Sequence, residues 1–296
     1  MRNLLLAPLL ALSALLSVPA HAEDWSKQAS ERDVILRDFR FGTGETMDIS
    51  IHVTTLGTPH RNAKGEIDNA VMVLHGTGGS GKQFYRPQFA DELYAAGKPF
   101  DLTKTYDILP DNIGHGQSSK LSDGMRMKFP RYDYDDMVTA QYRMLTEGLG
   151  VKRLKLILGT SMGCMHAFVW GTTRPGFAER LAPFACNAGA IAGRNRMWRK
   201  MSIDAIEADP AWNGGNYTSQ PELGLRTARY LSMIAGANPV ALQVQYPTRD
   251  KAEAYLAESY AARAANDLDA NDQIYQLDSS RNYNPEPLLE KVTVPV

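Results

Sequence analysis

The chain has 296 residues, of which 44% are hydrophobic and 22% are charged, and its formal net charge at pH 7 is −1. A chain this apolar and this close to neutral buries enough surface to fold, which excludes a mainly disordered protein. It also lacks the basic excess that nucleic-acid binding requires, so we expect no nucleic-acid partner. Two cysteines, Cys164 and Cys186, exclude a framework of several disulfides and a zinc site built from cysteines.

Residues 1–22 have the pattern of a secretory signal peptide. Arg2 supplies a positive charge, residues 4–18 form a nearly continuous apolar run, and Ala20-His21-Ala22 is a small-x-small cleavage site. The run is shorter than the ~20 apolar residues of a membrane span. We therefore expect cleavage after Ala22, a periplasmic or secreted protein, and no stable membrane insertion of the mature chain.

Residues 23–296 alternate short apolar segments with helical patterns, which predicts a single α/β domain with a mostly parallel sheet. The expected strands are residues 34–41, 47–56, 69–74, 106–110, 154–158 and 181–185, with a turn at 42–44 between the first two. Helices are expected over 133–149 and 162–173. Residues 192–290 indicate an inserted helical cap, with helices over 201–208 and 251–265, and residues 291–296 are expected to begin another strand.

Residues 159–163, Gly-Thr-Ser-Met-Gly, fit the G-x-S-x-G motif between a predicted strand and a predicted helix. Such a turn holds the serine in a strained conformation with its oxygen exposed, and the flanking glycines avoid clashes there. A serine that only caps a helix is the alternative, but the strand–turn–helix context favours Ser161 as a nucleophile. The Met162 amide, at the helix start, would then face the developing oxyanion.

Residues 75–80, His-Gly-Thr-Gly-Gly-Ser, follow a predicted strand directly and resemble the glycine-rich loop that supplies a second oxyanion amide, here that of Thr77. The same stretch, extended to Lys82, also matches the start of a phosphate-binding loop. Gln83 stands where that loop needs Ser or Thr for magnesium, so we prefer the oxyanion interpretation.

The other histidines and the cysteines carry no catalytic motif. His115 lies in a glycine-rich turn at 111–118, expected on the same rim as Ser161, where we expect it to support the site rather than react. His166, five residues after Ser161, is expected to pack in the core. Export would permit a bridge between Cys164 and Cys186, but we expect two buried thiols.

Several segments together resemble the homoserine O-acetyltransferase-like branch of the α/β-hydrolase superfamily. They are FPRYDYDDMVTAQ at 129–141, GTSMGCMH at 159–166, AIEADP at 205–210, GGNY at 214–217 and GLRTAR at 224–229. The resemblance implies an α/β-hydrolase fold in which Ser161 takes an acetyl group from acetyl-CoA and passes it to a hydroxyl. It also implies that Arg229 binds substrate, with acyl-CoA as a co-substrate and no permanently bound cofactor or metal.

In this fold the catalytic acid and histidine follow the serine in chain order, after later strands. No histidine occurs after His166, so we expect both groups to lie beyond residue 296 and the domain to be incomplete at its C-terminus. The leading hypothesis is an exported serine acyl-transfer enzyme that acts on a small-molecule ester or acyl donor through an acyl-Ser161 intermediate. The alternatives are a periplasmic carboxylic-ester hydrolase and an inactive α/β-hydrolase-like chain, and a homodimer stays open.

Overall fold

The computed structural model describes residues 24–264 and 269–296, so the predicted signal peptide lies outside the described residues. Six strands form one sheet in the order β1-β2-β4-β3-β5-β6. They are β1 (Ser30–Arg40), β2 (Thr46–Gly57), β3 (Ala70–Leu74), β4 (Tyr106–Pro110), β5 (Leu156–Thr160) and β6 (Leu181–Phe184). The first two strands add an antiparallel edge, and β4, β3, β5 and β6 run parallel. The expected mostly parallel sheet is thus confirmed.

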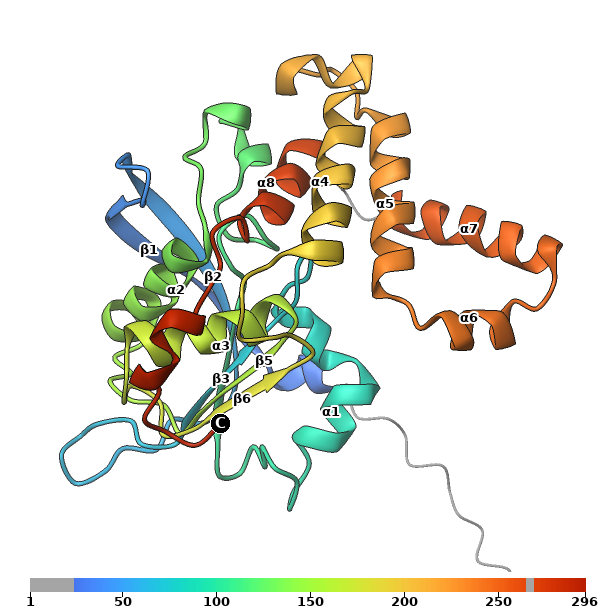
Figure 1. Cartoon of the computed structure of the whole chain (residues 1–296). Helices are drawn as coiled ribbons and strands as arrows, with labels where there is room; N and C mark the ends of the chain where they lie inside the picture. The colour runs from blue at the N-terminus through green and yellow to red at the C-terminus, as the bar shows by residue number, and fades with distance from the viewer. Residues whose placement is uncertain (1–23, 265–268) are drawn as a thin grey trace, which may run out of the picture.

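Helices cover both faces of the sheet, which explains why every residue of β3 and β4 is buried. Alternate residues of β3 point to opposite faces. Met72 and Leu74 pack in the cluster formed with α2 (Tyr134–Arg143) and α3 (Met162–Thr173), whereas Val71 and Val73 pack with α1 (Pro87–Leu93). Figure 1 shows α2 and α3 on one side of the sheet and α1 on the other.

In the described part of the chain, five further α-helices follow β6. They are α4 (Gly193–Glu207), α5 (Glu222–Gly236), α6 (Pro239–Gln245), α7 (Arg249–Ala264) and α8 (Ala270–Asp278). Ile206 of α4, Leu225 of α5 and Leu277 of α8 belong to a separate apolar cluster, so these three helices form a packed unit. We call α4, α5 and α8 the cap. The cap stands above the sheet, and α6 and α7 extend sideways from it (Figure 1).

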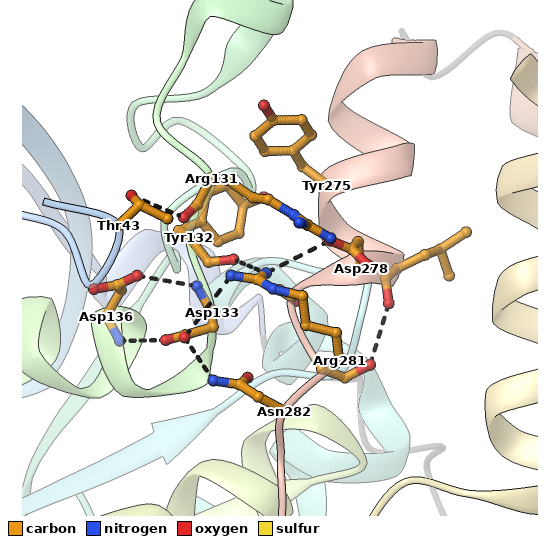
Figure 2. A network of polar contacts seen from close by, with 12 residues as sticks. Thr43, Arg131, Tyr132, Asp133, Asp136, Tyr275, Asp278, Arg281 and Asn282 are labelled. Atoms are coloured by element: carbon orange, nitrogen blue, oxygen red, sulfur yellow. Dashed lines mark hydrogen bonds and ion pairs between the residues drawn. The ribbon is translucent and has the colours of Figure 1, made fainter. Parts of the chain in front are cut away.

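The C-terminal end of α8 is tied to the chain just before α2 through Asp278. The Nη2 of Arg131 lies 2.6 Å from an Asp278 carboxylate oxygen, and Arg196 of α4 lies 3.7 Å from the other oxygen. Arg281 pairs with Asp278 at 3.5 Å and donates to the Tyr132 carbonyl at 2.7 Å. Figure 2 shows the guanidinium groups of Arg131 and Arg281 close together beside Asp278. These contacts fix the cap relative to the sheet.

Several expected boundaries differ from the structure. β1 begins four residues before the expected position, at Ser30, and α4 begins at Gly193 rather than at residue 201. β5 starts at Leu156 rather than at residue 154, because Leu154 pairs with Ala178 only as an isolated bridge. The predicted strand over 291–296 is wrong: a 3-10 helix occupies Glu286–Lys291, and the backbone after it makes one bond to β6, from the Leu181 N–H to the Pro295 carbonyl at 2.9 Å. Pro295 has no N–H with which to continue a ladder.

None of the helices in the described part of the chain is long and apolar enough to cross a membrane.

Candidate active site

Ser161 lies in the sharp turn between β5 and α3, with φ 54° and ψ −109°. A non-glycine residue rarely adopts this backbone conformation, and such strain concentrates at functional sites. The two motif glycines are needed for close packing around it. A Cβ at Gly159 would lie 2.0 Å from the Gly163 carbonyl oxygen, and one at Gly163 would lie 2.2 Å from the Leu74 oxygen. The sequence motif therefore forms the expected strained turn.

The loop after β3 lies directly against this turn. A Cβ built on Gly76 would come within 3.5 Å of the Ser161 Cβ, which brings the adjacent Thr77 beside the serine. Met162 is the first residue of α3, where backbone N–H groups have no partner within the helix. Neither the Thr77 nor the Met162 amide donates a hydrogen bond to another described residue. Both amides are thus available to an oxyanion.

Gln83 holds the loop in place. The Gly76 N–H donates to its side-chain oxygen at 3.3 Å, and its amide nitrogen donates to the Thr160 hydroxyl at 3.2 Å. This side chain therefore connects the loop to the end of β5. Sequence reasoning used Gln83 only as the residue that breaks a phosphate-loop motif and missed this role.

The phosphate-loop alternative does not match the local contacts. The Gly81 N–H donates to the Asp111 carboxylate at 2.7 Å, where a phosphate oxygen would be expected. Lys82 is paired with Glu31 at 3.3 Å, and the loop continues into a short 3-10 helix, Gly81–Tyr85. The segment is built around a carboxylate rather than around an anion-binding helix end.

A buried network lies behind the oxyanion loop. The His75 Nδ1 lies 2.8 Å from the Gly76 carbonyl, and its Nε2 accepts the Asn112 N–H at 3.1 Å. The second bond places the ring proton on Nδ1, from which it is donated to Gly76. Gln141 of α2 donates to the Asn112 side chain and to the His166 Nδ1, and it accepts from Trp170. This network orients the loop that carries Thr77.

Three histidines therefore surround the site without reaching the nucleophile. Burial lowers the pKa of His75 and of His166, and it lowers the pKa of His115 to about 3, so all three are neutral. As expected, His166 is fully buried and His115 packs against the His75 ring at 5.1 Å between centroids. Among the described residues, no histidine or carboxylate hydrogen-bonds to the Ser161 Oγ.

A cavity of about 630 Å³ opens in front of Ser161, between the sheet and the cap. Of the sequence-predicted site residues, Ser161, Thr77 and Arg229 all line it, whereas the Met162 side chain is buried. The cap contributes Trp198 and Arg199 from α4 and Gln273 and Gln276 from α8. No cluster of ligating side chains suited to a metal ion occurs among the described residues.

Sequence reasoning missed Arg199. It lies one helical turn before Ile203 and two turns before Ile206, on the apolar face of α4. The residue is only 2% exposed. An arginine at a position that the helical period assigns to the core was the available signal.

The expectation of two free thiols is wrong. Cys164, in the first turn of α3, and Cys186, just after β6, form a disulfide with 6.0 Å between their Cα atoms. This spacing is within the ordinary range for a disulfide. The pairing follows from the parallel neighbours β5 and β6, which bring the elbow helix beside the loop after β6.

Comparisons with known proteins agree with this geometry. The alpha/beta hydrolase fold family matches residues 69–290. The homoserine O-acetyltransferase of Chlorobaculum parvum is 33% identical over 206 residues, which are 64% of this chain and 54% of that protein. That of Solidesulfovibrio magneticus is 34% identical over 203 residues, 62% of this chain and 50% of that protein. The chain thus spans about half the length of these curated relatives.

Solved structures show the same fold. The homoserine O-acetyltransferase from Bacillus anthracis superposes with a TM-score of 0.74 at 22% identity, covering 86% of this chain and 76% of that one. An acetylester hydrolase from Corynebacterium glutamicum gives 0.75 at 20% identity, covering 90% and 80%. With the family match over most of its length, the chain belongs to the α/β-hydrolase fold family.

Proposed function

We propose that this protein is an exported serine acyl-transfer enzyme that forms an acyl-Ser161 intermediate and passes the acyl group to a hydroxyl acceptor or to water. The observation that carries the proposal is the position of Ser161. The residue occupies a strained turn at the mouth of a cavity of about 630 Å³, next to two unengaged amides. The similarity to acyltransferases and to an acetylester hydrolase supports the same class of chemistry.

In the proposed reaction, the Ser161 Oγ attacks the carbonyl carbon of an ester or thioester. The Thr77 and Met162 amides stabilise the resulting oxyanion, and removing one such donor typically costs ~100- to 1,000-fold in rate. Collapse of the intermediate expels an alcohol or thiol, and a second hydroxyl or a water then attacks the acyl-serine. An acyl-CoA thioester and a simple ester are both chemically suitable donors.

Attack by Ser161 requires a base that accepts its proton. Because no described histidine or carboxylate bonds to the Ser161 Oγ, we expect the 296-residue chain to acylate slowly by itself. Catalysis that rests on the oxyanion amides and on binding alone retains ~1,000- to 10,000-fold over water. Free imidazole should enter the cavity and accelerate acylation, since it supplies the missing base.

The test is intact-mass analysis of the purified protein treated with a fluorophosphonate probe, with and without imidazole. We expect one slow adduct on the Ser161 peptide, faster formation with imidazole, and no adduct in Ser161→Ala. A folded protein that forms no adduct even with imidazole would support the inactive alternative and refute the proposal. Rapid labelling without imidazole would show that a base lies within the chain and would refute the expected slow reaction.

The choice between transferase and hydrolase is read from the products. With a p-nitrophenyl ester as donor, a transferase converts an added alcohol into a new ester, whereas a hydrolase releases the free acid regardless of the alcohol. The side-chain oxygen of Gln273, which lines the cavity, has no hydrogen-bond partner among the described residues and offers one to an acceptor hydroxyl or to water.

A further inference from the structure

The cavity in front of Ser161 has an uneven charge. Among the described residues that line it, Arg199 and Arg229 are the charged side chains, and no aspartate or glutamate is present. The neighbouring cavity of about 560 Å³, which shares Gly78, Gln83, Gln273 and Gln276 with it, contains both Lys82 and the carboxylates of Asp269 and Asp272. Of these two cavities, the one at Ser161 is lined by cations without acids.

Arg199 is buried without a counter-ion. Its side chain projects from α4, and the residue is 2% exposed. The Nε donates to the Asn195 side-chain oxygen at 2.9 Å, and Nη1 donates to the Leu277 carbonyl at 3.4 Å. Within residues 24–264 and 269–296, no carboxylate lies within ion-pair distance of its guanidinium. By contrast, Arg196, one turn earlier on α4, is paired with Asp278.

A guanidinium removed from water without an anion is costly, and neutral oxygens offset only part of that cost. A purely structural bridge between α4 and α8 would not need a charge, because a neutral donor could reach the Leu277 carbonyl equally well. The buried Tyr134 hydroxyl lies next to the Arg199 guanidinium and the Thr77 hydroxyl, and as a neutral group it does not balance the charge of Arg199. Thr77 lines the same cavity as Ser161 and Arg199.

We propose that Arg199 is a specificity-determining residue that binds a carboxylate on the substrate, so that the preferred ester or acyl donor is a mono-anion with its acid group on the cap side of the cavity. This inference rests on the proposed function of Ser161. The planar guanidinium fork suits a carboxylate, and such charge-assisted hydrogen bonds are stronger than neutral ones. The reacting carbonyl then lies at Ser161, and the acid extends towards α4.

The test compares two ligands of the same shape that differ in charge: monomethyl succinate, an acid, and methyl succinamate, its neutral amide. Their affinities are measured by calorimetry at pH 7.5 with the Ser161→Ala protein, which cannot turn the ligands over because it lacks the nucleophile. We expect the acid to bind at least about tenfold more tightly, the effect of one charge-assisted hydrogen bond. Equal affinities would overturn the proposal without any further variant.

Variants then show which residue causes the preference for the acid over the amide. Arg199→Met, a side chain of similar length, should abolish the preference for the acid, and Arg199→Lys, which keeps the charge but loses the fork, should reduce it. Lys200→Gln removes a charge from the outer side of the same helix and should keep the full preference. The assignment is wrong if Arg199→Lys behaves like the parent, or if Arg229→Gln loses the preference while the Arg199 variants keep it.

The two proposals fail separately. Acid preference with no acylation of Ser161 would refute only the proposed function. Acylation of Ser161 together with equal binding of acid and amide would refute only the role of Arg199.

Discussion

Asp107 is the second residue of β4, and its side chain is fully buried with Thr105 as a neighbouring polar group. Burial raises the pKa of this carboxyl to about 7, with a smaller opposing effect from Thr105. The folded protein therefore holds a proton that the unfolded chain releases near pH 4. Between pH 4 and pH 7 the unfolded state binds fewer protons, so stability falls as the pH rises.

Asp107→Asn should remove this pH dependence. Three pKa units correspond to about 4 kcal/mol, so we expect the variant to be about 2–4 kcal/mol more stable than the parent at pH 8, and close to it at pH 4. Urea denaturation at the two pH values measures the difference. Asp250→Asn, at an exposed carboxylate, serves as the control. Parallel pH profiles for Asp107→Asn and the parent would contradict the argument.

At the scale of elements, the disulfide joins the start of α3 to the loop after β6 and thereby fixes the turn that presents Ser161. The bridge closes a loop between residues 22 positions apart, for which chain entropy gives a stabilisation of about 3 kcal/mol.

Replacing both cysteines with alanine should lower the free energy of unfolding by about this amount in urea titrations. Dithiothreitol should bring the parent down to the same value and leave the variant unchanged. Alkylation of two thiols in the untreated parent would show that the bridge is absent.

Local pattern was enough to predict elements whose limits are set by their own residues. β4 and α3 begin and end where the sequence placed them, because a buried apolar run and a helix stopped before Pro175 need no distant partner. β5 was misplaced by two residues since its start depends on pairing with β3, in which Val71 is the first residue to pair, with Leu156. The disulfide was missed for the same reason: no pattern around Cys164 reports its distance from Cys186.

At the scale of the whole molecule, some residues of the candidate site are positioned by local motifs and others by contacts between distant parts of the chain. The elbow and the oxyanion loop could be predicted because each is one motif next to one strand. Arg199, by contrast, lines the cavity only because the cap is held over the sheet by contacts between residues far apart in the chain. Arg131 and Asp278 are 147 residues apart, and Arg281 and Tyr132 are 149 apart. Such pairs leave no periodic signal in a single sequence.

The Asp278 junction should control the position of the cap and hence of Arg199. Asp278→Asn removes the charge shared by Arg131, Arg196 and Arg281 while it keeps the side-chain shape. The carboxylate is largely buried, but two of its partners are more exposed. The free energy of unfolding should therefore fall by about 2 kcal/mol, which is between the effects of losing a buried and a surface ion pair. Hydrogen exchange should speed up in α4 and α8 and stay unchanged in β3 and β5, because the cap has its own apolar cluster and can loosen separately.

The matched control is Asp204→Asn, which breaks an exposed pair with Lys200 on the outer side of α4 and should cost less than about 0.5 kcal/mol. If hydrogen exchange in the sheet of Asp278→Asn rises together with that in the cap, the two regions unfold as one cooperative unit. The Asp278 contacts then do not control the position of the cap separately from the sheet. If only the cap loosens, the affinity for monomethyl succinate should fall in Asp278→Asn although every residue that lines the cavity is intact. That outcome would tie the specificity of the site to the junction between α8 and the segment before α2.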